Sequence, residues 1–451
     1  MNFRGQNILV LGAGISGIAV AAILHKLGAK VTLNDDKAPD KIKGDVTPLR
    51  ELGVALIFGR QDVNLLDGID FIVVSPGVPI DIPLILAAKN KGITVMSEIE
   101  VAYHLCPAPI IAITGTNGKT TTTTLLGEML RTTGRDVVVG GNIGAALSQE
   151  VASVDKNGIV VAEISSFQLE GVIDFHPHIS AILNVTPDHL DRHYSMAAYI
   201  QMKERIFAKQ TAADYLILNY DDGILRDMSQ RTAAQVFFFS RKSEVENGAF
   251  VKDGVITITW QGKTLPVCAV EKMQIKGSHN IENAMAACGA AFLSGMPLPE
   301  IAAVLQTFAG VEHRIEPVRT VNGVEYYNDS KATNPESAMK ALESFPGHII
   351  LIAGGTDKHT DLTAFMGLVK EKTDHLILLG EAGERFCAAA KRAGVQSIHQ
   401  VATFTAAVDL AFQLAKPPQV VVLSPACSSY DMFANYEERG RAFKKMVREL
   451  G

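Results

Sequence analysis

The sequence predicts an α/β protein in which the sheets are mostly parallel. Short, continuous runs of apolar and β-branched residues recur along the chain, as is typical of strands that helices cover on both faces. Longer amphipathic stretches lie between many of these runs, so strands and helices alternate. The length of 451 residues suggests about three domains of ordinary size.

The expected elements can be placed one by one. The expected strands are Asn7–Leu11, Phe71–Val74, Ile110–Ile113, Ile159–Ala162, Ile179–Leu183, Tyr215–Leu218, Ile349–Ala353, Leu376–Leu379 and Val420–Leu423. Helices are expected after the third of these strands, ending near Arg131, and over Asn280–Leu293. A β-hairpin is expected at Ala249–Trp260, because Asp253-Gly254 separates two strand-like runs.

Two segments are candidate domain boundaries. The first is the proline-containing segment Cys106–Pro109, directly before a predicted strand. The second is Ala309-Gly310, which follows a predicted helix and a proline-containing turn. We therefore expect an N-terminal domain at residues 1–106, a central domain at 107–310 and a C-terminal domain at 311–451.

Composition narrows the class of protein. With 42 Lys and Arg against 48 Asp and Glu, the net charge is −6, so we expect no nucleic-acid partner. The five cysteines are odd in number and have no CxxC spacing, which favours a reducing cytoplasm over disulfides or a zinc site. Glycines interrupt the apolar run Ile8–Leu24, and His25-Lys26-Leu27 follows it in place of a cleavage site. We expect a cytoplasmic protein with no membrane association.

A glycine-rich segment near the N-terminus predicts a nucleotide pocket. Gly12–Gly17 (GAGISG) follows a predicted strand and opens a helix, and Asp35 and Asp36 end the next strand. Glycines let a diphosphate approach the amides of a helix N-terminus, and the acidic residue can hold a ribose hydroxyl. A UDP-linked sugar fits this pattern as well as a dinucleotide does. The alternative is a tight turn that binds nothing.

A phosphate-binding loop is predicted at Thr114–Thr120 (TGTNGKT). Its amides and Lys119 can cradle phosphates, and the hydroxyl of Thr120 can bind Mg²⁺. Ile113 stands where the general pattern has glycine, but strand, loop and helix follow in the expected order. We therefore expect an ATP site, with a chance occurrence of GKT as the alternative.

Polar residues follow the next two predicted strands. Glu163 follows one strand and Asn184 the other, and ligands gather at such carboxyl ends in α/β sheets. Glu163 is placed to hold Mg²⁺ beside the phosphate loop. His189 lies in the loop after the second strand, and by itself a loop histidine is more often a surface or capping residue.

Lys203 interrupts an apolar stripe. Tyr199, Ile200, Ile206 and Phe207 surround it at helical spacing, and lysine is rarely buried without a partner. Either the side chain reaches water along its apolar stem, or it is desolvated and available as a neutral amine.

The last third of the chain places cations and hydroxyls after strands. They lie in the segments His313-Arg314, Asn328–Pro335, Gly354–Lys358 and Ser424–Asp431. Each could be an ordinary polar turn, but together they suit a small dicarboxylate.

Seven motifs, in this order, resemble the Mur ligase family of peptidoglycan synthesis. They are TGTNGKT (Thr114–Thr120), EISSFQLE (Glu163–Glu170), NVTPDHLDRH (Asn184–His193), HNIENAMAA (His279–Ala287), HR (His313-Arg314), DSKATNP (Asp329–Pro335) and SPACSSYDMF (Ser424–Phe433). The last two are similar to the D-glutamate-adding members in particular. The resemblance implies a Rossmann-like N-terminal domain for a UDP-sugar, a central P-loop ATPase-type domain and a Rossmann-like C-terminal domain for the amino acid.

The resemblance also implies the site residues. Lys119, Glu163, His189 and Lys203 would be catalytic. ATP would be bound by Gly115, Thr116, Asn117, Gly118, Lys119, Thr120, Thr121, Asn283, Arg314 and Asp329. Mg²⁺ would be held by Thr120, Glu163, His189 and Lys203, the last carbamylated. The UDP-sugar would contact Ser16, Asp35, Asp36, Lys37, Ser75, Gly77 and Asn142. D-glutamate would contact Lys331, Thr333, Lys358, Ser429 and Tyr436. At Tyr430 and Tyr436 the chain departs from the apolar residues of better-known members.

The implied reaction is the ATP-dependent addition of D-glutamate to UDP-N-acetylmuramoyl-L-alanine through an acyl phosphate. The enzyme would be a cytoplasmic monomer that uses ATP, Mg²⁺ and these two small molecules. The alternatives are a relative adding lysine or diaminopimelate, a folylpolyglutamate synthetase-like enzyme, an NAD-dependent oxidoreductase and a non-enzymatic ATP switch.

Overall fold

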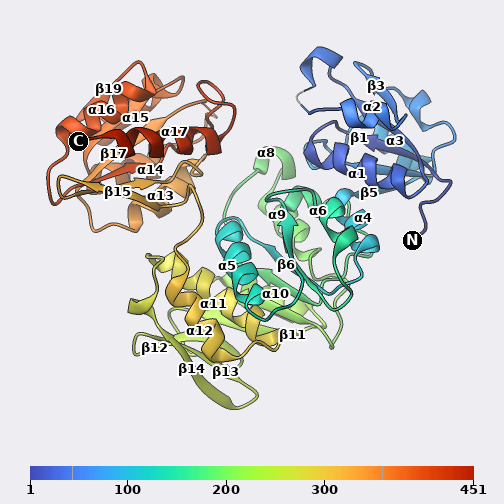
Figure 1. The fold of residues 1–451 in the computed structure, drawn as a ribbon, viewed down its shortest axis with the longest axis horizontal. Helices are drawn as coiled ribbons and strands as arrows, with labels where there is room; N and C mark the ends of the chain where they lie inside the picture. The colour runs from blue at the N-terminus through green and yellow to red at the C-terminus, as the bar shows by residue number, and fades with distance from the viewer. Residues whose placement is uncertain (43, 358) are drawn as a thin grey trace. The chain divides into compact units, whose positions relative to one another are not determined.

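The computed structural model describes residues 1–42, 44–357 and 359–451, and the strands in these ranges form three sheets (Figure 1). The contacts within the chain divide it into two compact units. The first comprises residues 1–273 and 282–306, and the second comprises residues 274–281 and 307–451. Among the described residues, none of the helices combines the length and apolar character needed to cross a membrane. The predicted α/β class is confirmed.

The N-terminal sheet is parallel and doubly wound. Its elements are β1 (Asn7–Leu11), α1 (Ile15–Lys26), β2 (Lys30–Asp35), α2 (Thr47–Glu51), β3 (Ala55–Phe58), β4 (Phe71–Val74), α3 (Pro83–Asn90), β5 (Thr94–Ser97) and α4 (Glu98–Leu105). The strand order is β3-β2-β1-β4-β5. Ile8 and Val10 share a core with α1, whereas Leu9 and Leu11 share one with α3. Burial on both faces explains why β1 is a continuous apolar run.

The central sheet is parallel from β7 to β12 and antiparallel beyond. Its strands are β6 (Ile110–Thr114), β7 (Val137–Gly141), β8 (Ile159–Glu163), β9 (Ile179–Ile182), β10 (Tyr215–Asn219), β11 (Gln235–Ser240), β12 (Gly248–Lys252), β13 (Val255–Trp260) and β14 (Lys263–Ala269). They follow the order β14-β13-β12-β11-β10-β9-β6-β8-β7. The predicted hairpin is confirmed as β12–β13, and Asp253 and Gly254 both have positive φ, as its tight turn requires.

Helices accompany this sheet along the chain. They are α5 (Lys119–Arg131), α6 (Leu147–Glu150), α7 (Ser166–Leu169), α8 (Leu190–His193), α9 (Met196–Glu204), α10 (Gly223–Met228), α11 (Ser278–Leu293) and α12 (Leu298–Thr307). Ile110 and Ala112 of β6 share a core with α6, α9 and α10. The predicted helices after β6 and over residues 280–293 are confirmed.

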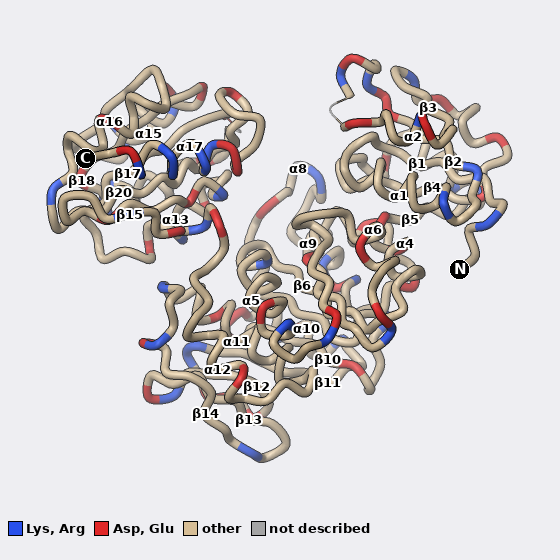
Figure 2. The backbone as a smooth tube through the Cα atoms, viewed as in Figure 1, with Lys and Arg blue, Asp and Glu red and all other residues tan. Residues whose placement is uncertain are grey.

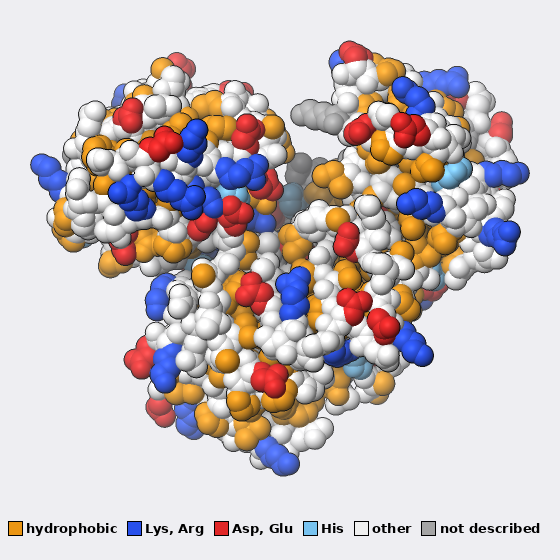
Figure 3. Space-filling view, in the orientation of Figure 1, with side chains coloured by type: hydrophobic (Ala, Val, Ile, Leu, Met, Phe, Trp, Pro, Cys, Tyr) orange, Lys and Arg blue, Asp and Glu red, His pale blue; other side chains and the backbone are white. Residues whose placement is uncertain are grey.

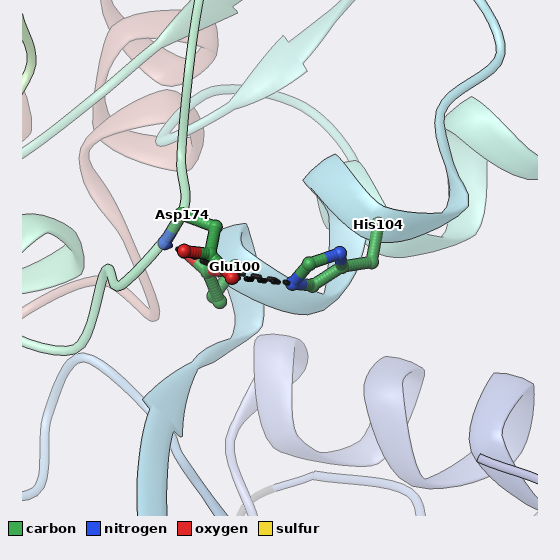
Figure 4. A group of neighbouring side chains, drawn as sticks. All are labelled: Glu100, His104 and Asp174. Atoms are coloured by element: carbon green, nitrogen blue, oxygen red, sulfur yellow. Dashed lines mark hydrogen bonds and ion pairs between the residues drawn. The ribbon is translucent and has the colours of Figure 1, made fainter. Parts of the chain in front are cut away.

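Carboxylates of α4 tie this helix to the central part of the first unit. Glu98 accepts a hydrogen bond from the amide of Ser148 (2.6 Å). Glu100 accepts three, from the amides of residues 173–175 (2.8, 2.9 and 3.1 Å), and His104 lies 3.0 Å from its carboxylate (Figure 4). The amides already use both oxygens of Glu100, so we interpret this cluster, which includes Asp174, as a structural clamp.

The C-terminal sheet is a second doubly wound layer. Its elements are β15 (Glu316–Val321), β16 (Val324–Asn328), α13 (Pro335–Glu343), β17 (Ile349–Gly354), α14 (Thr363–Lys372), β18 (Thr373–Leu379), α15 (Gly383–Ala393), β19 (Ile398–Gln400), α16 (Phe404–Leu414), β20 (Val420–Leu423) and α17 (Tyr436–Glu449). The order is β15-β16-β20-β17-β18-β19, with only β15 antiparallel among these strands. Leu351 and Ala353 face the core with α13, α14 and α15, whereas Ile350 and Ile352 face α16 and α17.

Charged residues are mixed in sign on the surface. Helix α17 carries two acidic residues, Glu437 and Glu438, in its first turn and basic residues after them (Figure 2). On the face drawn in Figure 3, Lys and Arg side chains lie among acidic and apolar ones. This mixing agrees with the small net charge of −6.

Candidate active site

The phosphate loop joins the carboxyl end of β6 to the N-terminus of α5. Gly118 has a φ of 86°, and a Cβ placed on it would lie 2.2 Å from Oδ1 of Asn283. Only glycine fits both the left-handed backbone and this close approach. The amides of the loop and the start of α5 thus form the anion-binding end of a helix.

Asn184 holds the phosphate loop from the neighbouring strand. Its Oδ1 accepts a hydrogen bond from the amide of Asn117 (2.8 Å), and its Nδ2 donates to the carbonyl of Asn117 (3.1 Å). The amide of Thr116 donates to the carbonyl of Asn184 (3.0 Å). The loop is therefore held in one conformation by protein contacts alone, which lowers the cost of ordering it around a phosphate.

Lys119 folds back over the same loop. Its Nζ donates to the carbonyls of Gly115 (2.8 Å) and Thr116 (2.9 Å). The ammonium is thus held at the loop, where it can attract phosphate oxygens. Thr120 and Thr121, the next residues of α5, are buried.

Glu163 places a carboxylate beside the phosphate loop. It ends β8, opposite Ile113 of β6, and is only 2% exposed. Oε1 accepts a hydrogen bond from Nδ2 of Asn142 (2.9 Å), whereas Oε2 is buried without a hydrogen-bond partner among the described residues. Burying an oxygen without a partner costs free energy, so we expect this atom to bind a cation or accept a hydrogen bond from a ligand.

Lys203 is buried beside the same loop. It is 1% exposed, so the alternative in which the side chain reaches water is wrong. Its Nζ lies 4.5 Å from the ring centroid of Tyr199, whose hydroxyl is 3.2 Å from Oγ1 of Thr116. Burial, and next the charge of Lys119, hold the pKa of Lys203 well below its usual value. In the described part of the chain, no carboxylate forms an ion pair with it.

His189 lies at the start of α8, in the loop after β9. Its backbone has a φ of 53°, and its side chain is about half exposed. The ring centroids of His189 and Phe167 are 4.7 Å apart, and Nε2 of His189 lies 3.5 Å from Asp188. The half-exposed ring is accessible to a ligand.

A pocket of about 580 Å³ lies at the carboxyl ends of β1 and β4. Its lining includes the seven residues predicted to contact the UDP-sugar, namely Ser16, Asp35, Asp36, Lys37, Ser75, Gly77 and Asn142. These strands flank the point where the strand order reverses, which is where doubly wound sheets bind ligands. Asp35 also accepts hydrogen bonds from the amides of Ala13 (2.8 Å) and Lys37 (3.0 Å), so it shapes the glycine-rich loop.

The second unit gathers the C-terminal motifs at the ends of β16, β20 and β17, which are neighbours in the sheet. Asp329 is buried and accepts hydrogen bonds from Oγ of Ser424 (2.7 Å) and the amide of Ile315 (3.2 Å). Burial raises the pKa of Asp329 to about 7. The amide of Thr356 donates to the carbonyl of Ser428 (3.0 Å), which joins two of the motifs.

Of the residues predicted to contact D-glutamate, Lys331, Thr333 and Ser429 lie in these loops, and Tyr436 begins α17. Nζ of Lys331 is 5.4 Å from the ring centroid of Tyr436, and Ser429 is buried. Tyr430 is 67% exposed. Thr333 follows Lys331 in the same loop, and Lys358 lies outside the described residues.

The candidate residues thus fall into two sets, one in each unit. The first unit contains Asn283 and all the candidates from Ser16 to Lys203, and the second contains Arg314, Asp329 and the described D-glutamate candidates.

Sequence reasoning assigned no role to Arg439 or to the hydroxyl of Tyr199. Arg439 is buried and donates to the carbonyls of Ser330 (2.8 Å) and Cys427 (3.1 Å), so it organises two C-terminal motifs. The available signal was its spacing of four residues from Phe443 on α17, which places it on the buried face. For Tyr199, the available signal was a hydroxyl-bearing aromatic residue on an otherwise apolar stripe, which indicates a buried hydroxyl with a polar partner.

Three family models match successive parts of the chain. The Mur ligase MurD-like N-terminal domain matches residues 6–97, the Mur ligase middle domain residues 113–291, and the Mur ligase glutamate ligase domain residues 313–427. The chain is 46% identical over 452 residues to the UDP-N-acetylmuramoylalanine–D-glutamate ligase of Thermoanaerobacter sp. (strain X514), with 100% of both chains covered. It is 46% identical over 450 residues to the ligase of that name from Geotalea uraniireducens (strain Rf4), covering 100% of this chain and 99% of the relative.

Two solved structures share the fold at low identity. A pseudomurein peptide ligase type C from Methanothermus fervidus gives a TM-score of 0.61 at 18% identity, covering 99% of this chain and 100% of that one. The UDP-N-acetylmuramate-alanine ligase of Thermotoga maritima gives 0.59 at 19% identity, covering 98% and 99%.

Proposed function

The chain belongs to the Mur ligase family, and we propose that it joins D-glutamate to UDP-N-acetylmuramoyl-L-alanine in an ATP-dependent step of peptidoglycan precursor synthesis. Full-length identity of 46% to ligases named for this reaction supports the substrate pair. The structural observation that carries the proposal is the position of Asn142. This residue lines the predicted UDP-sugar pocket and also donates to Glu163 beside the phosphate loop (2.9 Å).

We propose one task for each predicted domain. Residues 1–106 bind the UDP moiety, residues 107–310 bind ATP, and residues 311–451 bind D-glutamate and the nucleoside of ATP. The carboxyl ends of the strands support this division, because each sheet carries its candidate residues there.

ATP solves the chemical problem of the reaction. The alanyl carboxylate resists attack by an amine because it is anionic and has no good leaving group. Transfer of the γ-phosphoryl group to one of its oxygens gives an acyl phosphate and ADP. The D-glutamate amine then attacks the carbonyl carbon, an amide bond forms, and phosphate leaves with both electrons of the broken C–O bond.

The residues around the phosphate loop fit a magnesium ion. Oε2 of Glu163, which has no hydrogen-bond partner among the described residues, is an oxygen ligand of the kind Mg²⁺ prefers. Thr120, His189 and carbamylated Lys203 complete the proposed set. When bound, Mg²⁺ would offset the negative charges that converge on the transferred group. The lowered pKa of Lys203 supports carbamylation, in which the neutral amine bonds to the carbon of CO₂ and releases a proton.

The side chains of the chain perform the remaining tasks. Lys119 and the amides of the phosphate loop hold the ATP phosphates, with Asn283, Arg314 and Asp329 at the nucleoside. Lys331, Thr333, Lys358, Ser429 and Tyr436 hold D-glutamate and orient its amine. We propose that the enzyme works as a monomer, because the candidate set needs no residue from a second copy. We also propose a cytoplasmic location, since the number and spacing of the five cysteines favour a reducing compartment.

Phosphate release tests this function. The purified chain, with ATP and Mg²⁺, is mixed with UDP-N-acetylmuramoyl-L-alanine and with D-glutamate, L-glutamate, L-lysine or diaminopimelate in turn. Sustained phosphate release should require both the UDP-sugar and D-glutamate. Release with lysine or diaminopimelate in place of D-glutamate would identify a different member of the family, and release with neither substrate would point to a simple ATPase.

A further inference from the structure

Arg192 lies between the wall of the UDP-sugar pocket and the loop that carries His189. It belongs to α8, three residues after His189, and its side chain is 15% exposed. Its Nη2 donates a hydrogen bond to the carbonyl of Val78 (2.9 Å), and Val78 lines the pocket. The guanidinium group of Arg192 therefore links the pocket wall at Val78 to α8.

A buried carboxylate fixes the orientation of this guanidinium. Nε of Arg192 donates to Oε1 of Glu170 (3.1 Å) and Nη2 donates to Oε2 (2.5 Å), while the Glu170 side chain is only 4% exposed. Nη1 of Arg205 holds the main chain of Glu170 through its carbonyl (2.7 Å). A two-point pair of this kind allows one geometry, so Arg192 cannot move independently of α7 and its flanking residues.

Arg192 also supports the ring beneath His189. Its Cζ lies 5.0 Å from the ring centroid of Phe167, and that ring lies 4.7 Å from the ring of His189. A continuous set of contacts thus leads from Val78 through Arg192 and Phe167 to His189. None of these contacts requires a bound ligand.

We propose that Arg192 is a positioning residue that couples occupancy of the UDP-sugar pocket to the placement of His189 at the phosphate site. The proposal rests on the proposed function, in which the ligand in this pocket carries the carboxylate that receives the phosphoryl group. When the ligand contacts the pocket wall, it fixes the Val78 carbonyl, which in turn fixes the Arg192 guanidinium and the loop that carries His189. Binding of the UDP-sugar and of ATP with Mg²⁺ is then cooperative, and the coupling is reciprocal.

The test replaces both members of the Arg192–Glu170 ion pair, so that neither charge is left buried without its partner. The double variant Arg192→Gln/Glu170→Gln avoids the unpaired carboxylate that a single change would create. Arg135→Gln is the matched control, because Arg135 also donates to main-chain carbonyls, those of Asn157 (3.2 Å) and Gly158 (2.9 Å), but does not line the pocket.

Isothermal titration calorimetry measures the affinity for UDP-N-acetylmuramoyl-L-alanine with and without a non-hydrolysable ATP analogue and Mg²⁺. In the wild type and in Arg135→Gln, the analogue should tighten UDP-sugar binding about tenfold. In the double variant the tightening should fall below about twofold, while each ligand alone binds within about threefold of wild type. The kcat should fall about 10- to 100-fold, as expected for a lost positioning contact, and the KM for the UDP-sugar at saturating ATP should rise about five- to tenfold, because the coupling that tightened its binding is lost.

The outcomes separate this inference from the proposed function. A wild type without coupling, or a double variant that retains it, would overturn the role of Arg192. Loss of both separate affinities in the double variant would show a merely structural pair and would overturn it as well. A wild type that binds both ligands cooperatively but releases no phosphate in the presence of D-glutamate would contradict the proposed function and leave the coupling intact.

Discussion

At the scale of single residues, Lys203 has an environment that is unusual for a lysine. Its amine is 1% exposed and lies against an aromatic ring, and burial holds its pKa well below the usual value, so this environment favours the neutral amine. This state suits reaction with CO₂ and does not suit an ordinary ion pair.

Replacement of Lys203 tests that interpretation. Lys203→Ala should lower kcat by about 100-fold or more, because a metal ligand is lost, and short-chain carboxylates should restore part of the activity by supplying an oxygen ligand. Lys209→Ala is the control, since Lys209 is about half exposed and its ion pair with Asp174 lies at the surface. Turnover of Lys203→Ala at the wild-type rate would remove this residue from the site.

Asp329 makes the stability of the protein depend on pH. Burial raises its pKa to about 7, so between pH 4 and 7 the folded state binds more protons than the unfolded state, and stability falls as the pH rises. Asp329→Asn cannot ionise, so its melting temperature relative to wild type should be higher at pH 8 than at pH 5. The difference should correspond to at most roughly 4 kcal/mol. An offset independent of pH would show that Asp329 is already ionised at pH 5.

The sequence predicted individual residues best where local patterns decide their environment. Lys203 could be recognised as unusual because Tyr199, Ile206 and Phe207 share its helical face, but the sequence left two alternatives open, and the structure decides for burial. Arg439 could not be assigned a role, since its partners Ser330 and Cys427 lie 109 and 12 residues away. No local spacing encodes such contacts.

At the scale of elements, one geometric rule organises the candidate sites. The glycine-rich loop follows β1, the phosphate loop follows β6, and Asp329 follows β16. Parallel strands bring their carboxyl ends to one edge of the sheet, so polar residues placed after strands converge there. The seven residues predicted for the UDP-sugar accordingly line one pocket. Strand ends differed from the prediction by a residue or more, as where β8 includes Glu163 and β18 begins at Thr373.

The phosphate loop tolerates no side chain at Gly118. In Gly118→Ala the new Cβ would strike Asn283 and the backbone would remain left-handed, so the loop must shift and kcat/KM should fall by about 100-fold or more. Gly134 has a similar φ of 73°, but a Cβ placed there would meet nothing within 4 Å, so Gly134→Ala should cost only about 1–2 kcal/mol of stability. Equal phosphate-release rates for the two variants would contradict the importance of the close approach.

At the scale of the whole molecule, the two compact units each hold part of the candidate set. The phosphate loop, Glu163 and Lys203 belong to the first unit, and Asp329 and Lys331 to the second. The three-domain α/β architecture followed from length, alternation of elements and motif order. The tie between α4 and residues 173–175 did not, because buried carboxylates that accept main-chain hydrogen bonds leave no pattern in the sequence.

The central claim is that the alanyl carboxylate is activated by phosphoryl transfer. The most direct measurement uses UDP-N-acetylmuramoyl-L-alanine with ¹⁸O in both carboxylate oxygens, together with ATP, Mg²⁺ and D-glutamate, and mass spectrometry of the released phosphate. One carboxylate oxygen leaves with the phosphoryl group when the amine attacks, so each phosphate should contain one ¹⁸O atom. Phosphate released without ¹⁸O, while the amide still forms, would show that the oxygen came from water and would contradict the acyl phosphate.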